Sequence, residues 1–140
     1  MSEGYAGDRD PWNVHDALTS EKDSVLIDVR TVPEWQFVGV PDLSALGKDV
    51  LFIEWQSYPE MKINENFVDD VRAAGVKPEQ PVYLICRSGV RSKAAAKALT
   101  AAGYHVCYNV AEGFEGDKDD RARRGSVGGW RYHDLPWRQQ

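Results

Sequence analysis

The feature that most constrains the fold is an apolar run that leads into a short polar loop and then into an alanine-rich segment. The apolar run is Pro81–Ile85, the loop is Cys86–Ser92 and the alanine-rich segment is Lys93–Ala102. An uninterrupted apolar run predicts a strand that is covered on both faces, and small residues at helical spacing predict a helix that packs closely on a sheet. Cys86 therefore lies at the carboxyl end of a buried strand, where ligands bind in open parallel sheets.

Similar apolar runs recur along the chain and predict the other strands. They are the runs Val25–Ile27, Val50–Ile53 and His105–Val110, and a further short strand is expected near Tyr5 in the polar N-terminal segment. Helical patterns fall between them, and this alternation favours a three-layer α/β/α fold around a mainly parallel sheet of about five strands. A chain of 140 residues has the size of one domain, so we expect residues 1–140 to form a single domain.

Capping residues predict where three helices begin. Asn13 and Asn64 precede the helical patterns Val14–Thr19 and Glu65–Ala74, and asparagine can satisfy the first free N–H groups of a helix. In Thr31–Glu34, a threonine followed three residues later by a glutamate forms a capping box, which predicts a short helix after the strand at Val25.

The loop after the buried strand contains groups that stabilise a cysteine thiolate. A thiol attacks only as its thiolate, and neighbouring cations or a helix N-terminus favour that form. Arg87 and Arg91 stay charged at any working pH, and the main-chain N–H groups of the loop can converge on an anion. Gly89 suits a position with positive φ, and Ser92 is the expected N-cap of the following helix. We therefore expect Cys86 to be a nucleophile that handles anions.

The spacing between the cysteine and the second arginine separates two kinds of chemistry. Cysteine-dependent phosphatases carry Cys-x5-Arg, a loop wide enough for a tetrahedral phosphate, whereas four residues separate Cys86 from Arg91. A smaller loop fits a single sulfur atom on the cysteine better than a phosphate. The spacing favours sulfur transfer, with a phosphatase or arsenate reductase and a non-catalytic binding module as the alternatives.

The loop resembles the active-site loop of the rhodanese family of sulfurtransferases. The similarity extends to Leu26–Arg30, which resembles the Asp-Val-Arg strand end of that family, and to the glycine turn Asn109–Phe114. Trp130 and Leu135–Trp137 are similar to the closing segment of many members. The chain departs from the family at Gly39–Leu43, where many members carry a histidine that is absent here.

The resemblance implies a rhodanese-like domain that transfers a sulfane sulfur in two steps. Cys86 would take the sulfur from a small anionic donor such as thiosulfate and hold it as a persulfide, with Arg91 stabilising the charge. The rest of the loop would surround the persulfide, namely Arg87, Ser88, Gly89, Val90 and Ser92. A thiol, protein thiols included, or cyanide would then accept the sulfur, and no cofactor is required.

Two charged residues follow the predicted strand at Val25–Ile27 and are expected to support the site. If the strands are parallel, Asp28 and Arg30 lie at the same sheet edge as Cys86. In one interpretation, Asp28 accepts hydrogen bonds from the cysteine loop or pairs with Arg91. In the other, these residues only tie down the next loop, and the sequence leaves both open.

Composition and charge argue against several other classes of function. A net charge of −5 gives no support for nucleic acid as a partner, and no apolar stretch reaches the roughly 20 residues that a membrane span needs. The three histidines are isolated, so no metal site is expected. Two cysteines form no disulfide framework, and Met1–Tyr5 do not resemble a signal peptide. We therefore expect a cytoplasmic protein in which Cys107 is a buried structural thiol.

Three segments lie outside the pattern of predicted strands and helices. Glu54–Lys62 is a long loop with aromatic residues, which either walls the site at Cys86 or covers an edge of the core. Residues 115–128 are a charged insertion, expected to be solvated and helical or else to form a docking surface or a flap near the site. Trp130–His133 is predicted to be a short terminal helix, and Trp137 to pack back on the body.

Overall fold

The apolar run before Cys86 forms the central strand of the sheet. This strand, β7 (Val82–Ile85), is buried along its whole length. It pairs in parallel with β2 (Val25–Asp28) on one side and with β8 (Cys107–Val110) on the other. A strand with a neighbour on each side and helices over both faces has no solvated surface, which explains why its sequence is apolar without alternation.

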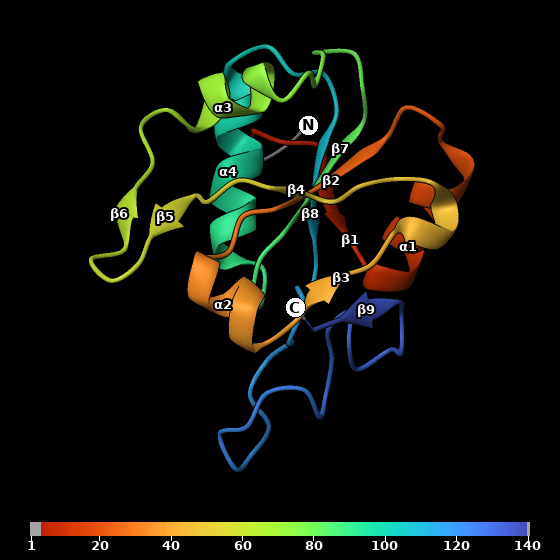
Figure 1. Cartoon of the computed structure of the whole chain (residues 1–140), viewed down its shortest axis with the longest axis vertical. Coiled ribbons are helices and arrows are strands. Elements are labelled where there is room, and N and C mark those ends of the chain that lie inside the picture. Colours follow the sequence, from red (N-terminus) through yellow and green to blue (C-terminus); the bar gives the residue numbers. More distant parts are fainter. Residues whose placement is uncertain (1–3, 140) are drawn as a thin grey trace.

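Two short strands complete the sheet at its edges. In the computed structural model, which describes residues 4–139, these are β1 (Gly7–Arg9) and β4 (Leu51–Phe52). The strand order is β1-β8-β7-β2-β4, and every neighbouring pair is parallel (Figure 1). The predicted parallel sheet of about five strands is confirmed. At Val50–Ile53, however, the expected buried strand is wrong, because β4 is an edge strand and is only half-buried.

Helices cover both faces of this sheet. α3 (Phe67–Ala73) and α4 (Val90–Ala101) lie on one face, and α1 (Pro11–Ser20) lies on the other (Figure 1). Successive side chains of a strand point to opposite faces, so Leu84 packs with α3 and α4 while Tyr83 packs with α1. The three-layer α/β/α architecture expected from the sequence is therefore present.

Two helices begin at residues other than those predicted. α1 begins at Pro11 and not at Val14, because proline has a fixed φ that suits the first helical position. α3 begins at Phe67, later than predicted, because the Asn64 side chain accepts a hydrogen bond of 2.9 Å from the N–H of Asn66. Asn64 thereby forms a turn ahead of the helix and not its cap.

The helix after the cysteine loop begins earlier than predicted. α4 starts at Val90 and not at Lys93, with Gly89 as its N-cap residue. The φ angle of Gly89 is +115°, in a region that glycine adopts without strain. Ser92 is therefore not the N-cap but is buried in the first turn of the helix. The early start of α4 directs the Ser92 hydroxyl inward, towards the sulfur of Cys86.

Short elements follow the strands β2 and β4. α2 (Val32–Phe37) begins with the predicted capping box, in which Glu34 accepts hydrogen bonds from the N–H and the hydroxyl of Thr31. β5 (Gln56–Ser57) and β6 (Lys62–Ile63) form an antiparallel hairpin inside the segment that the sequence predicted to be a long loop. The hairpin and α2 both lie near the carboxyl edge of the sheet.

The C-terminal segment folds back on the body of the molecule. β9 (Trp137–Arg138) pairs antiparallel with β3 (Val40–Pro41), and Trp137 packs against the core on the α1 side, as predicted. Trp130 is fully buried in the same core. Residues 130–133 form turns, so the short terminal helix predicted there is wrong.

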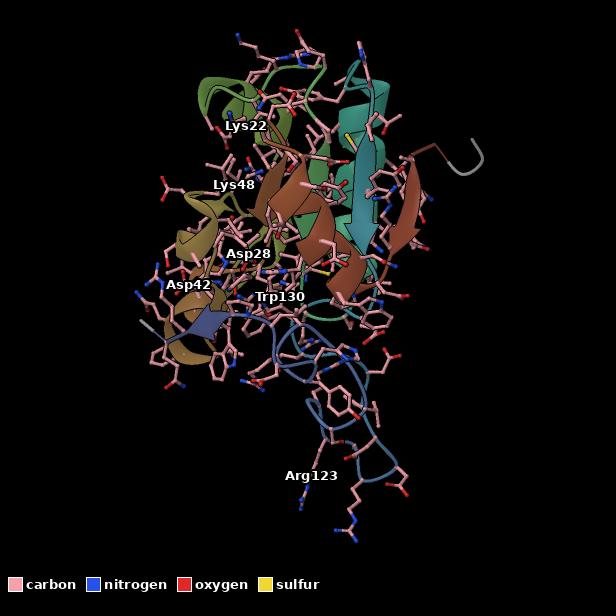
Figure 2. All side chains as sticks on the ribbon, turned by 90° about the vertical axis from the view of Figure 1, so that its right-hand side faces the viewer. Lys22, Asp28, Asp42, Lys48, Arg123 and Trp130 are labelled. Carbon is pink, nitrogen blue, oxygen red and sulfur yellow. The ribbon has the colours of Figure 1, made fainter. Side chains whose placement is uncertain are left out.

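The charged insertion is a long loop that crosses itself at its base. Residues 115–128 contain turns and bends but no helix, so the expectation of a helical insertion is wrong. Arg123 lies at the far tip and points away from the body (Figure 2). At the base, a Cβ on Gly129 would lie 2.6 Å from the nitrogen of Gly116, so only glycine allows this crossing.

The helices are short, from η1 (Ser44–Leu46), a 3-10 helix, to α4. Among residues 4–139, no helix is both long and apolar enough to cross a membrane. Met1–Tyr5 were not expected to be a signal peptide. Of these residues, 1–3 lie outside the described residues.

Candidate active site

Cys86 follows β7 directly, and its side chain points into the start of α4. Its sulfur accepts a hydrogen bond of 3.1 Å from the N–H of Gly89 and one of 3.1 Å from the hydroxyl of Ser92. The residue is only 1% exposed. The left-handed backbone of Gly89 and the early start of α4 bring both donors to the sulfur, and the positive end of the helix dipole lies beside it.

A chain of hydrogen bonds connects the buried sulfur to the surface. The Ser92 oxygen lies 2.5 Å from Oδ1 of Asn109, and Nδ2 of Asn109 donates to Asp8 at 2.9 Å. Ser92 and Asn109 are buried, whereas Asp8 is exposed on β1. Because the Asp8 carboxylate accepts from the amide nitrogen, the amide oxygen of Asn109 faces Ser92. Ser92 has one hydroxyl proton, which either the Cys86 sulfur or Oδ1 of Asn109 accepts at a given time, and the chain fixes the position of the hydroxyl between the two.

Arg91 pairs with Glu34 and not with Asp28. Its two terminal nitrogens donate to the two carboxylate oxygens at 2.7 and 2.9 Å, and both side chains are largely buried. Burial alone would raise the pKa of Glu34, but the Arg91 guanidinium and the capping contacts with Thr31 lower it to about 2. Burial lowers the pKa of Arg91, but Glu34 and the more distant charge of Cys86 raise it overall. The predicted pairing of Asp28 with Arg91 is therefore wrong.

Asp28 and Arg30 form a buried ion pair behind the site. Arg30 donates to both oxygens of Asp28, with the shortest contact at 2.7 Å, and neither side chain is exposed. Arg30 also donates to the carbonyl of Gly39 at 2.8 Å and lies over the ring of Phe114. The pair fixes the chain that follows β2, which agrees with the second interpretation from the sequence.

The cysteine lies at a cavity of about 570 Å³. Its walls come from the cysteine loop, from the start of α2 and from the β5–β6 hairpin. The lining residues are Thr31, Pro33, Glu34, Gln56, Tyr58, Met61, Cys86, Arg87, Ser88, Val90 and Arg91. The segment Glu54–Lys62 thus walls the site, one of the two roles that the sequence left open.

The predicted loop residues divide into two groups. Gly89 and Ser92 contact the sulfur from behind, and both are buried. Arg87 and Val90 are exposed on the cavity side, with Ser88 between them. The structure therefore brings the whole loop together, while Asp28 and Arg30 do not line the cavity.

The glycine turn after β8 holds the cysteine loop from outside. The N–H of Phe114 donates to the carbonyl of Cys86 at 2.8 Å, and that of Glu115 donates to the carbonyl of Arg87 at 2.9 Å. A Cβ on Gly113 would lie 2.5 Å from the carbonyl oxygen of Cys86, so the close approach requires glycine. The inserted segment is thus anchored directly against the site.

The sequence did not reveal three of the groups that complete the site. Asn109 and Asp8 support Ser92, and Glu34 holds Arg91, but they come from three separate parts of the chain. Glu34 carried a signal as a capping residue and as part of the family resemblance, but nothing in the sequence indicated its pairing with Arg91. Nothing in the local sequence around Asn109 or Asp8 indicates that they approach a cysteine loop.

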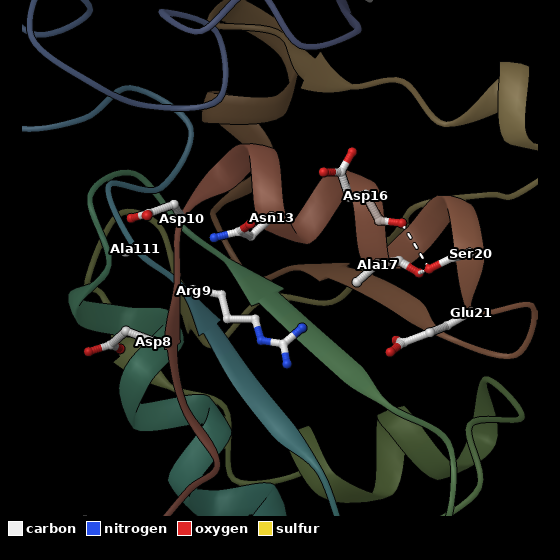
Figure 3. Close-up of a pocket in the computed structure, with 9 residues that line it drawn as sticks. All are labelled: Asp8, Arg9, Asp10, Asn13, Asp16, Ala17, Ser20, Glu21 and Ala111. Carbon is white, nitrogen blue, oxygen red and sulfur yellow. Dashed lines mark hydrogen bonds between the residues drawn. The ribbon is translucent and has the colours of Figure 1, made fainter.

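A second cavity lies under α1 and is distinct from the site at Cys86. It has a volume of about 580 Å³, and Arg9, Asp16 and Glu21 are among its lining residues (Figure 3). Arg9 lies 3.5 Å from the hydroxyl of Tyr83 and stacks over Tyr108. The many carboxylates in this cavity disfavour an anionic sulfur donor.

Cys107 is buried like Cys86 but does not line the cavity. It is fully buried inside β8, and burial raises the pKa of its thiol to about 11. The interpretation of Cys107 as a structural residue is consistent with this environment. Across residues 4–139, no three histidine, cysteine or acidic side chains are grouped so that they could hold a metal ion.

Comparisons with known proteins place the chain in a family. Residues 11–140 match the family described as the STR4 middle domain, which is rhodanese-like. The crystal structure of Rv0390 from M. tuberculosis is 46% identical, with a TM-score of 0.89 over 97% of this chain and 99% of that chain. The uncharacterized protein RC0915 of Rickettsia conorii is 39% identical over 124 residues, which are 88% of this chain and 89% of that protein.

A more distant structure has the same fold. The polysulfide-sulfur transferase homodimer of Wolinella succinogenes is 23% identical, with a TM-score of 0.63 over 95% of this chain and 78% of that chain. At this identity the likeness concerns the fold alone. Together with the match over residues 11–140, it leads to one conclusion: the chain belongs to the rhodanese-like STR4 middle domain family.

Proposed function

We propose that the protein is a sulfurtransferase that carries a sulfane sulfur on Cys86 as a persulfide. The observation that carries this proposal is the position of the Cys86 sulfur at a cavity, with the N–H of Gly89 and the hydroxyl of Ser92 directed at it. Such donors, beside the N-terminus of a helix of 12 residues, favour a negative sulfur. The activity of the polysulfide-sulfur transferase with the same fold supports this class of reaction.

In the first step, the Cys86 thiolate attacks the outer sulfur of an anionic donor such as thiosulfate. A bond forms between the two sulfur atoms, the sulfur–sulfur bond of thiosulfate breaks, and sulfite leaves with the electron pair. Arg87, exposed on the cavity side, attracts the donor. The sequence suggested that Arg91 stabilises the negative sulfur directly. The two terminal nitrogens of Arg91 already donate hydrogen bonds to Glu34, so its effect on the sulfur is indirect.

In the second step, cyanide or a thiol takes the outer sulfur and returns the electron pair to Cys86. The loop donors hold the negative persulfide between the two steps. Each step moves one sulfur atom with its bonding electrons accounted for, so no cofactor is needed. A reducing compartment such as the cytoplasm would keep the thiol free for the next turnover.

Steady-state kinetics with thiosulfate and cyanide test the proposal. We expect thiocyanate to form with parallel double-reciprocal plots, because the first product leaves before the second substrate binds. Cys86→Ser should abolish turnover, whereas Cys107→Ala should retain it, because Cys107 does not line the cavity. Hydrolysis of an aryl phosphate in the absence of any sulfur transfer would contradict the proposal and favour a phosphatase.

A further inference from the structure

The charged side chains around the cavity and a negative sulfur on Cys86 sum to no net charge. Glu34, Arg87 and Arg91 are the charged residues among those lining the cavity. The pKa of Glu34, about 2, keeps its carboxylate ionised at any working pH, and this carboxylate is tied to Arg91. Cys86 carries one negative charge both as a thiolate and as a persulfide, so the lining has no net charge in either state. Net charge therefore does not favour a charged acceptor over a neutral one, and the nature of the wall decides the preference.

The opening of the cavity is apolar. Tyr58 and Met61 line it from the hairpin, Val90 from the first turn of α4, and Pro33 from α2. Tyr58 is 63% exposed and Val90 is 78% exposed, although both are large apolar side chains. Exposed apolar side chains that gather around one opening are typical of a binding site.

The hairpin that carries this wall is held by hydrogen bonds. The side chain of Gln56 donates to the carbonyl of Met61 at 2.9 Å, and the N–H of Asn64 donates to the carbonyl of Trp55 at 2.8 Å. The apolar groups are therefore presented by a paired element and not by an open loop. The cavity volume of about 570 Å³ lies in the range of small-molecule sites.

We propose that the sulfur acceptor is a low-molecular-weight thiol with an apolar, uncharged body. This assignment rests on the proposed transfer through Cys86 and adds the class of molecule that receives the sulfur. The thiolate of the acceptor attacks the outer sulfur of the persulfide and forms a new sulfur–sulfur bond. The bond from that sulfur to Cys86 breaks, and its electron pair leaves the cysteine as a thiolate. The apolar body lies meanwhile against Tyr58, Met61 and Val90.

Single-turnover transfer from the loaded protein tests the acceptor class. The full chain is loaded with thiosulfate, freed of excess donor and weighed, and then mixed with 2-phenylethanethiol or with 2-mercaptoethanesulfonate. The rate of sulfur loss is divided by the rate of the same thiol with glutathione persulfide, which removes differences in intrinsic reactivity. We expect the corrected rate to favour the phenyl compound about tenfold to a hundredfold, as apolar pockets do for apolar groups.

Variants that keep side-chain shape test whether the wall causes the preference. Met61→Gln and Val90→Thr replace apolar groups at the opening by polar ones of similar shape and should each reduce the preference severalfold. Ile63→Thr is the matched control, since Ile63 is 51% exposed on the same hairpin but does not line the cavity. It should retain the preference of the unmodified protein.

The outcomes separate the two proposals. If the protein does not gain a sulfur atom, sulfur transfer and the acceptor class are both wrong. If it gains the sulfur but gives equal corrected rates, or a faster rate with the sulfonate, only the acceptor class is wrong. A cysteine-containing decapeptide that reacts faster than 2-phenylethanethiol would also overturn it, and would indicate a protein acceptor. Loss of the preference in Ile63→Thr would contradict the role of the cavity wall.

Discussion

At the scale of single residues, the proposed chemistry depends on the few groups that touch one sulfur atom. Gly89 contributes a main-chain N–H, which a change of side chain leaves in place, whereas Ser92 contributes a side-chain hydroxyl. The hydroxyl is buried and positioned by Asn109. Its hydrogen bond to the Cys86 sulfur can therefore be measured by a single side-chain substitution.

Ser92→Ala should slow the alkylation of Cys86 by iodoacetamide at neutral pH about tenfold to a hundredfold, because a hydrogen bond to a charged group contributes about 1.5–3 kcal/mol. Thr100→Ala is the control, because it removes a hydroxyl from the same helix that donates to the carbonyl of Ala96. The rates are followed by mass spectrometry. Equal rates for Ser92→Ala and the unmodified protein would show that the hydroxyl does not stabilise the thiolate.

The Glu34–Arg91 pair makes stability depend on pH in the acid range. The folded-state pKa of Glu34, about 2, lies below its ordinary value of 4.5, so the unfolded chain binds the proton more readily. The stabilisation is therefore complete above about pH 4.5 and is lost as the pH falls towards 2. Because Glu34 is partly solvated, we expect about 2 kcal/mol over this range.

Urea unfolding at pH 6 and pH 3 measures this effect in Glu34→Gln. The unmodified protein should lose more stability between the two pH values than Glu34→Gln does, because the variant has no carboxylate to protonate. Glu60→Gln, which removes an exposed carboxylate from the hairpin tip, is the control for the loss of one charge. An identical pH dependence in Glu34→Gln and the unmodified protein would refute the role of the ion pair.

The sequence predicted those site residues that are close together in the chain. Cys86, Gly89 and Arg91 belong to one short loop, so their proximity follows from covalent connectivity. The partners of Arg91 and Ser92 did not follow, because Glu34 and Asn109 reach the loop only when α2 and β8 pack around it. A sequence pattern contains local spacing but not the packing that selects one ion pair among several candidates.

At the scale of the elements, glycines decide how closely segments approach the site. Gly129 has a φ of +105° and Gly103 has a φ of +104°, so alanine would be strained to a similar extent at both positions. The surroundings differ, because a Cβ on Gly129 would overlap the chain at Gly116 whereas a Cβ on Gly103 has nothing within 4 Å. The pair therefore separates backbone strain from steric overlap.

Gly103→Ala should cost about 1 kcal/mol of unfolding free energy, from the left-handed backbone alone. Gly129→Ala should cost about 1–3 kcal/mol more, because its neighbours must move. Chemical unfolding of both variants checks the difference. Similar destabilisation by the two substitutions would mean that the crossing at the base of the inserted loop is not tightly packed.

The sequence predicted the type of most elements better than their ends. The strands at Val25 and Val82 follow from their apolar runs, but β4 is less buried than its apolar sequence suggested, because it lies at an edge. Two helix starts moved because Pro11 and Gly89 begin α1 and α4 ahead of the expected caps. Gly89 displaced Ser92 in this way, since a left-handed turn starts the helix one turn earlier.

At the scale of the whole molecule, the two core layers share the strands of one sheet, and the C-terminal strand returns to β3. We therefore expect residues 1–140 to unfold as one cooperative unit, as single domains of this size do. Urea transitions followed by tryptophan fluorescence and by far-ultraviolet circular dichroism should coincide. Separate transitions would contradict the proposal of a single domain.

The central claim is that Cys86 holds a transferable sulfur in its loop. The most direct test is the intact mass of the reduced protein after incubation with thiosulfate and removal of the excess. We predict a gain of one sulfur atom in the unmodified protein, none in Cys86→Ser, and loss of the gained sulfur when cyanide is added. An unchanged mass, or the same gain in Cys86→Ser, would contradict the account.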